Sequence, residues 1–289
     1  MTSSRILQHP SALVNQISRI AQEAGEITLE YFDDSGMMDG MTKEDGSPVT
    51  EADQKAEDYI TKKLKELTPE VLIIGEEAVA GGYRPDVSDA EYYWLVDALD
   101  GTKEFISGSG DYTVNIALIH QGNPILGVVY APYLGEMYTG NLETGATRWI
   151  DEVETQKEIE TRKIPRKGLT VVSSKSHGSG DKLNDFLDQF HVEKVIKKGS
   201  SLKICIIAAG KADLYPRFGP TCEWDIAAGD AVLRAAGGGL SDINGQPMTY
   251  TGKDPKFLNC EFIAWSGDLY EAHQNAQGDE DEDEAETEK

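Results

Sequence analysis

Two aspartates, Asp97 and Asp100, follow a short apolar run at 94–96 and precede Gly101 and Thr102. The apolar run predicts a buried strand that ends in an acidic turn. Neighbouring carboxylates repel each other, so a fold that buries both needs a cation between them. Mg2+ is the natural candidate, because it prefers carboxylate and carbonyl oxygens and completes its shell with water and a substrate phosphate.

The backbone between and after these aspartates could bind both a cation, through a carbonyl oxygen, and an anion, through N–H groups. The Leu99 carbonyl could face the cation while its side chain points into the core. Gly101 permits a sharp turn, after which the N–H groups of Gly101 and Thr102 could face a phosphate. The alternative is that Asp-Gly marks an ordinary solvated turn.

A second predicted strand, 71–74, also ends in acidic residues, at Glu76 and Glu77. Open α/β sheets place their ligands where the ends of strands converge. Glu76 is therefore the third predicted ligand, whereas Glu77 could be a solvated neighbour.

Two further acids stand at predicted helix starts. Thr50 and Asp53 have the spacing of N-cap and N3, so Asp53 could cap its helix or receive a proton from a nucleophile. Asp225 lies in the first turn of a helix rich in small residues, where it could stabilise the N-terminus or act as the last metal ligand.

Polar residues in the second half follow predicted strands: His177, Ser200, Lys203 and Arg217. A lysine supplies a point charge and an arginine a planar fork for phosphate. Each cation alone is a common surface residue. In an acidic chain, however, two of them facing one cleft would concentrate an anionic substrate.

The composition bounds the class of protein. With 289 residues, 39% apolar and 27% charged, the chain can bury a sizeable core in two packed halves. The formal charge of −24 argues against nonspecific binding to nucleic acid. The sequence has no apolar run of transmembrane length, and its start lacks the apolar segment of a signal peptide. We expect a cytoplasmic protein, with a peripheral position on the cytoplasmic side of the inner membrane left open.

Three unclustered cysteines suit reduced thiols and neither a disulfide framework nor a zinc site. The chain ends in an acidic tail, in which residues 279–289 hold eight acids and one lysine, and we expect this tail to be disordered. No catalytic role is assigned to it.

Hydrophobic periodicity predicts helices that pack on sheets, with an antiparallel meander in the first half and α/β alternation in the second. Residues 151–166, which are polar, are predicted to bridge the halves. The expected helices are 11–32, 50–67, 181–190, 201–209 and 224–236. The expected strands are 71–74, 92–96, 112–119, 124–130, 136–138, 169–173, 194–196, 212–215 and 261–265.

Three motifs in this order resemble the lithium-sensitive, Mg2+-dependent phosphatases of the inositol monophosphatase superfamily: GEE at 75–77, DALDGT at 97–102 and WDIAAG at 224–229. Within that superfamily, PVTEAD, YWLVDALDGTKEFI, GSSLKIC and LYPRFGP resemble the 3′(2′),5′-bisphosphate nucleotidases. The resemblance implies a layered αβαβα sugar-phosphatase fold. It also implies an α+β metal-binding half (1–160), an α/β half that closes over substrate (161–270) and the acidic tail (271–289).

The resemblance further implies an enzyme that hydrolyses adenosine 3′,5′-bisphosphate to AMP and phosphate, with the sulfated nucleotide PAPS as a second substrate. Two or three Mg2+ ions would be held by Glu76, Asp97, the Leu99 carbonyl, Asp100 and Asp225. Asp53 and Thr102 would orient and deprotonate the attacking water. The implied substrate-binding set is Glu76, Leu99, Asp100, Gly101, Thr102, His177, Ser200, Lys203, Arg217 and Asp225.

One position departs from the family pattern, which usually has proline where this chain has Ala98. Alanine leaves the unfolded chain more conformational freedom, at a cost of about 0.5–1 kcal/mol. Two rival functions remain open: an inositol or sugar monophosphatase on the same scaffold, and a non-catalytic anion-binding protein with a structural cation. A monomer and a homodimer are both compatible with the sequence.

Overall fold

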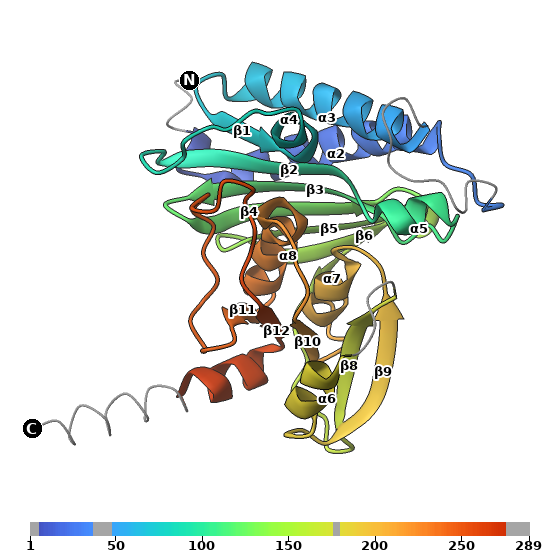
Figure 1. The fold of residues 1–289 in the computed structure, drawn as a ribbon, viewed down its shortest axis with the longest axis vertical. Coiled ribbons are helices and arrows are strands. Elements are labelled where there is room, and N and C mark those ends of the chain that lie inside the picture. Colours follow the sequence, from blue (N-terminus) through green and yellow to red (C-terminus); the bar gives the residue numbers. More distant parts are fainter. Residues whose placement is uncertain (1–5, 37–47, 176–179, 276–289) are drawn as a thin grey trace, which may run out of the picture.

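A computed structural model of the chain describes residues 6–36, 48–175 and 180–275 (Figure 1). Two sheets form its frame. The larger sheet has seven strands in sequence order, with β1 parallel to β2 and every later pair antiparallel. Its strands are β1 (Leu72–Gly75), β2 (Tyr92–Asp100), β3 (Thr113–His120), β4 (Asn123–Ala131), β5 (Glu136–Asn141), β6 (Gly145–Ile150) and β7 (Thr155–Ile159).

The smaller sheet has five strands in the order β11-β12-β10-β8-β9. The strand β8 pairs in parallel with β9 and β10, whereas β12 is antiparallel to β10 and β11. Its strands are β8 (Leu169–Ser174), β9 (Val192–Lys198), β10 (Leu214–Arg217), β11 (Gly239–Asp242) and β12 (Phe262–Trp265).

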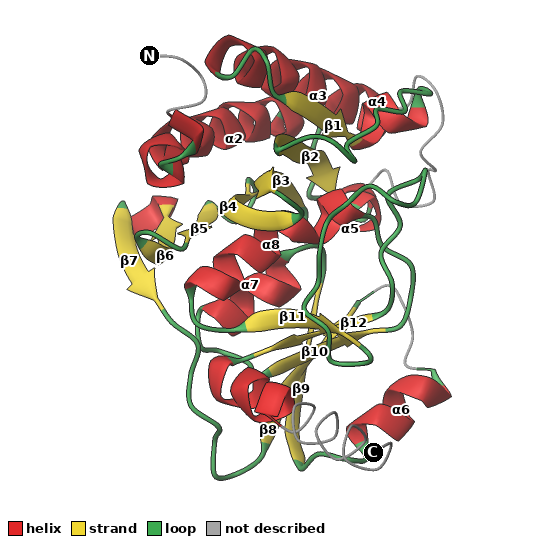
Figure 2. Ribbon diagram, turned by 90° about the vertical axis from the view of Figure 1, so that its left-hand side faces the viewer, coloured by secondary structure: helices red, strands yellow, loops and turns green. Residues whose placement is uncertain are grey.

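Helices and sheets alternate in five layers (Figure 2). Helices α2 (Val14–Leu29) and α3 (Pro48–Leu67) cover one face of the large sheet. Helices α7 (Leu202–Ala208) and α8 (Glu223–Ala235) lie between the sheets, and α6 (Asp181–Leu187) lies on the far side of the small sheet. This arrangement confirms the predicted αβαβα fold.

Each interface between layers has an apolar core. Buried side chains of α2 and α3 pack against one face of β2, β3 and β4, including Ile17, Ile60 and Trp94. Buried side chains of α7 and α8 pack between the sheets. The helix α8 lies very close to the large sheet, since a Cβ on Gly127 would stand 2.2 Å from the Ala228 carbonyl oxygen. This close approach brings the start of α8 to the ends of the strands.

Several predicted elements differ from the structure. The second strand continues to Asp100 and does not end before Asp97. Thr50 lies inside α3, which begins at Pro48, so the predicted cap by Thr50 and Asp53 is wrong. The predicted bridge at 151–166 contains β7, an exposed edge strand with too few apolar residues to stand out.

Besides β7, the strands β6 and β11 and the short helices α4 (Glu76–Ala80) and α5 (Thr102–Ile106) were not predicted. Two 3-10 turns lie at Pro10–Leu13 and Asp151–Val153, and a further unpredicted helix covers 267–275, after β12 (Figure 1). The predicted disorder of the tail and the position of His177 lie outside the described residues. Within the described ranges, no helix is both long and apolar enough to cross a membrane.

Candidate active site

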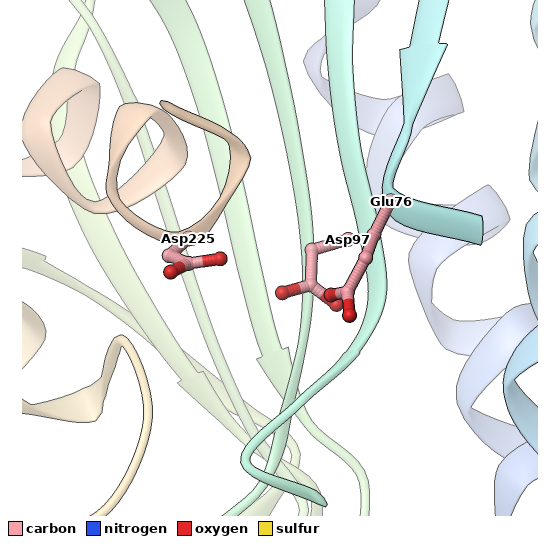
Figure 3. A group of neighbouring side chains, drawn as sticks. All are labelled: Glu76, Asp97 and Asp225. Atoms are coloured by element: carbon pink, nitrogen blue, oxygen red, sulfur yellow. The ribbon is translucent and has the colours of Figure 1, made fainter. Parts of the chain in front are cut away.

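Three carboxylates from distant parts of the chain meet at one end of the large sheet. Glu76 begins α4, Asp97 lies on β2 and Asp225 lies in the first turn of α8. Oxygens of all three lie within 4.8 Å of one another, and Figure 3 shows the side chains pointing toward a common centre. The predicted convergence of these acids therefore occurs.

A bulge in β2 separates the two aspartates of the central motif. Asp97 pairs with Asn115 and Asp100 with Thr113, so Ala98 and Leu99 together face one residue of β3. The Leu99 amide donates a 3.0 Å hydrogen bond to Asp97 Oδ1. An extra residue in a strand redirects the side chains that follow it. The bulge thus directs Asp100 toward a different set of neighbours from those of Asp97.

The chain turns sharply after Asp100. Gly101 has φ = 98°, a left-handed conformation that a side chain would strain, and α5 begins at the next residue, Thr102. The predicted glycine turn is therefore present. Both residues line a cavity of about 260 Å3 that opens between the two sheets.

Asp100 links the large sheet to the segment that precedes α7. Its Oδ2 accepts a 2.7 Å hydrogen bond from the Ser201 amide and a longer one, 3.4 Å, from Asn115 Nδ2. The Ser201 hydroxyl donates to the Asp225 carbonyl oxygen. Neither Ser201 nor Asn115 was predicted as a site residue, although an asparagine within the apolar strand at 113–120 was a usable signal.

The Asp225 carboxylate, at the start of α8, contacts both the helix N-terminus and the other acids. One carboxylate oxygen accepts a 2.8 Å hydrogen bond from the Cys222 amide, which caps the helix. Its carboxylate also belongs to the group with Glu76 and Asp97. The two alternatives for Asp225, helix stabiliser and member of the acidic group, are thus compatible.

Asp53 is completely buried on α3. The start of α3 packs beside the motif, because Val49 and Ala52 share an apolar cluster with Leu99 and Phe105. The negative charge of Asp53 is one of the causes that raise the pKa of Asp97. A buried acid next to this group has a different environment from a helix cap in solvent.

The carboxylates of Glu76, Asp97, Asp100 and Asp225, here called the acidic group, repel one another when no cation lies between them. Burial, followed by the charges of Glu76 and Asp100, raises the pKa of Asp97 well above its ordinary value. Burial and the charge of Asp100 do the same to the pKa of Asp225. Burial also raises the pKa of Asp100, although Lys203 and the Ser201 amide oppose that rise. Buried oxygens that repel each other are a donor set suited to a hard divalent cation, so these residues fit Mg2+.

Two cations, Lys203 and Arg217, line the same cavity. Lys203 and Arg217 are only 8% and 9% exposed, so neither is an ordinary surface cation. Lys203 donates to the Ser200 carbonyl oxygen and lies 5.5 Å from the centroid of the Tyr215 ring. Arg217 donates 3.2 and 3.0 Å hydrogen bonds to the carbonyl oxygens of residues 219 and 220.

The cavity joins the acidic and basic groups. Asp100, Asp225, Lys203 and Arg217 all line it, together with Ser200, which has φ = 43°. The lining residues are Asp100, Gly101, Thr102, Lys103, Glu104, Ser174, Ser200, Ser201, Lys203, Ile204, Tyr215, Arg217, Pro220, Thr221, Asp225 and Ile226. The cavity could therefore accept an anion whose negative groups face both a cation site and fixed positive side chains.

The model of the inositol monophosphatase family matches residues 10–276, and the chain belongs to that family. Among its curated relatives is the 3′(2′),5′-bisphosphate nucleotidase CysQ of Escherichia coli K12, which is 43% identical over 251 residues, covering 86% of this chain and 98% of the relative. The protein of the same name from Buchnera aphidicola is 36% identical, covering 87% and 93%. The predicted resemblance to nucleotidases of this type is confirmed.

Solved structures agree with this assignment. The crystal structure of CysQ from Bacteroides thetaiotaomicron superimposes with a TM-score of 0.73 at 34% identity, covering 86% of this chain and 94% of that one. An inositol monophosphatase from Anabaena has a TM-score of 0.68 at 22% identity, covering 92% and 94%, and shows the same fold.

Proposed function

We propose that this protein is a metal-dependent phosphatase that removes the 3′-phosphate of adenosine 3′,5′-bisphosphate, giving AMP and phosphate. The observation that carries the proposal is one cavity lined both by the acids Asp100 and Asp225 and by the cations Lys203 and Arg217. The nucleotidase relatives supply the substrate class. PAPS, which carries the same 3′-phosphate, is proposed as a second substrate.

The proposed metal is Mg2+, in two or three ions. Glu76, Asp97 and the Leu99 carbonyl would hold one ion, and Asp97, Asp100 and Asp225 the second. Paired ions in such sites lower the pKa of water and neutralise the oxygens of the transferring phosphoryl group. The raised pKa values of Asp97 and Asp225 support the assignment, because a cation would relieve the same repulsion that protonation relieves.

Asp53 and Thr102 are proposed to orient the attacking water and to take its proton. The completely buried Asp53 carboxylate suits this task because it lies close enough to Asp97 for its charge to act on that acid, next to the proposed metal ligands. Thr102 lines the cavity next to Gly101, where backbone N–H groups could face the phosphate.

Lys203, Arg217 and Ser200 are proposed to bind the remaining part of the nucleotide, together with His177. Two buried cations in one cavity favour a substrate with a second negative group over one that has a single phosphate. The proposed partner is thus a small nucleotide bisphosphate, with no nucleic acid. Free, unclustered cysteines suit a reducing compartment, and we place the enzyme in the cytoplasm.

The decisive experiment is phosphate release from adenosine 3′,5′-bisphosphate, inositol 1-phosphate and fructose 1,6-bisphosphate in parallel. Each substrate is tested with Mg2+, with a chelator and with lithium. We expect a strong preference for the nucleotide that the chelator abolishes. Preference for inositol 1-phosphate would keep the metal site and refute the substrate, and no release from any of them would favour a non-catalytic anion-binding protein.

A further inference from the structure

A buried carboxylate outside the acidic group holds the start of α4. Glu57 lies on α3 with 3% of its surface exposed. Its Oε2 accepts a 2.8 Å hydrogen bond from the Glu77 amide, and its Oε1 accepts one of the same length from the Ala78 amide. These first amides of a helix have no partner within the helix itself. Glu57 therefore acts as a cap supplied by a different helix.

Gly75 makes room for this contact. It precedes α4 with φ = −110° and ψ = 152°, an extended conformation open to any residue. A Cβ at this position, however, would stand 2.3 Å from the Glu57 carboxylate carbon and from one of its oxygens. The glycine is thus required for space and not for its backbone angles, and Gly75 and Glu57 form a matched pair.

Glu57 contacts the backbone on both sides of Glu76. Glu76 lies between Gly75 and Glu77, and its carboxylate is one of the three that meet near Asp97. Helix α4 has only five residues, too few to be stable by itself. The direction of Glu76 is thus set by what holds the backbone on either side of it.

The position of Glu57 on α3 fits such a role. Glu57 follows Asp53 by four residues, so both carboxylates lie on the same face of the helix. The same face of α3 continues with Ile60 and Leu64, which are completely buried, as is the neighbouring Ala56, and this apolar packing fixes the helix in the core. Burial raises the pKa of Glu57 to about 7, against the two amide hydrogen bonds, which lower it. Burying this carboxylate costs free energy, so its contribution to folding does not by itself explain why it is there.

We propose that Glu57 is a positioning residue for the metal site: by accepting the Glu77 and Ala78 amides it fixes the start of α4 and thereby directs the Glu76 carboxylate toward Asp97 and Asp225. The inference rests on the proposed function of these acids as metal ligands. Groups that orient metal ligands affect metal affinity by about 10–100-fold when they are replaced.

The test compares Glu57→Gln with Ile60→Val, a variant that removes buried surface from the same helix and leaves the cap intact. Binding of Mg2+ alone is measured by calorimetric titration, and kcat and KM for adenosine 3′,5′-bisphosphate are measured across a range of Mg2+ concentrations. Glu57→Gln should bind Mg2+ about tenfold more weakly than Ile60→Val, with much of the lost activity restored at high Mg2+. Gly75→Ala should change the metal affinity in the same direction.

The possible outcomes separate the two proposals. If the wild-type protein hydrolyses the nucleotide and Glu57→Gln binds Mg2+ as tightly as Ile60→Val does, Glu57 has no positioning role. If the wild-type protein neither binds Mg2+ nor hydrolyses the nucleotide, the proposed function and the inference are both wrong. Should Glu57→Gln not fold, the same comparison is made with Glu57→Asp and Gly75→Ala.

Discussion

The Ser201 amide donates a 2.7 Å hydrogen bond to Oδ2 of Asp100, across 101 residues of sequence. Ser201 directly precedes α7, which carries Lys203, and its hydroxyl also contacts the Asp225 carbonyl oxygen. The loop that presents the basic side of the cavity is therefore attached to two of the proposed metal ligands. Cation binding and nucleotide binding should be coupled through this loop.

Asp97→Asn should abolish hydrolysis without unfolding the protein. Burial and the neighbouring acids raise the pKa of Asp97, so its negative charge is unfavourable in the metal-free fold and the neutral amide removes that repulsion. We expect kcat/KM to fall by about 1000-fold or more, since metal sites supply several kcal/mol of transition-state stabilisation.

The accompanying measurement is thermal unfolding with Mg2+ and with chelator. Without metal, Asp97→Asn should unfold at the same temperature as the wild type or higher. Added Mg2+ should stabilise only the wild type, because only that protein has the complete site. Normal activity combined with a lowered midpoint would show that Asp97 has a structural role.

Mg2+ should bind more weakly as the pH is lowered. The raised pKa values of Asp97 and Asp225 mean that protons compete with the cation for the same oxygens. Calorimetric titrations at about pH 8.5 and about pH 6 should give lower affinity at the lower pH, with proton release visible as a dependence on the buffer's ionisation enthalpy. Equal affinities and no proton release would contradict the raised pKa values.

The raised pKa values of Asp97 and Asp225 also determine how the free energy of unfolding of the metal-free protein changes with pH. Acids with a raised pKa bind more protons in the folded state than in the unfolded state between their ordinary and raised values. The contribution of Asp97 and Asp225 to the free energy of unfolding should therefore rise as the pH falls through that interval. Asp97→Asn should flatten this dependence.

The convergence of the acids could be predicted because it depends on local order. Glu76 directly follows β1, Asp97 lies near the end of β2, and Asp225 lies at a helix start; each position is visible in a short window, and sheet topology brings such ends together. The burial of Lys203 could not be predicted in this way. It depends on how closely the second sheet approaches the first.

The bulge at Ala98 and the cap by Glu57 required information from other strands and helices. A bulge is defined by the partner strand, here through the pairs that flank Val114, and the sequence of β2 alone reads as a strand that stops early. Glu57 caps a helix that begins 19 residues later and is too short to show a periodicity of its own.

Asp111→Asn should loosen the contact between the two halves. Lys175 Nζ and Lys198 Nζ lie 2.6 and 2.9 Å from the carboxylate oxygens of Asp111; Lys198 ends β9 and Lys175 directly follows β8. Burial opposes the charge of Asp111, but the two lysines outweigh it and hold its pKa below the ordinary value. We expect a loss of about 1–2 kcal/mol, limited because both lysines are partly exposed.

The pH dependence of unfolding tests this ion pair. A lowered pKa gives stability that is present at neutral pH and is lost in acid, below about pH 4. Chemical unfolding of Asp111→Asn should accordingly differ from the wild type at neutral pH and approach it in acid. Glu51→Gln, which breaks an exposed pair with Lys55, is the control and should have the smaller effect.

Lys203→Met should impair use of the nucleotide more than it impairs the fold. The ammonium is buried beside Tyr215 and faces the cavity, so its loss removes a charge-assisted contact of about 2 kcal/mol, or about 30-fold in kcat/KM. Lys211→Met, at an exposed position after α7, is the matched control. An equal loss in both variants would rule out a role for Lys203 in substrate binding.

Ala98→Pro should stabilise the protein. Ala98 is completely buried in the bulge of β2 and has no paired residue on β3, so its amide is not required by the register of that ladder. Proline restricts the unfolded chain and should add about 0.4–1 kcal/mol where the native backbone accepts it. Urea unfolding measures the gain, and activity at limiting Mg2+ shows whether the stiffer turn holds the Leu99 carbonyl better. A lower free energy of unfolding would mean that the Ala98 amide is needed in the folded state, and that the proline usual in the family requires a different bulge.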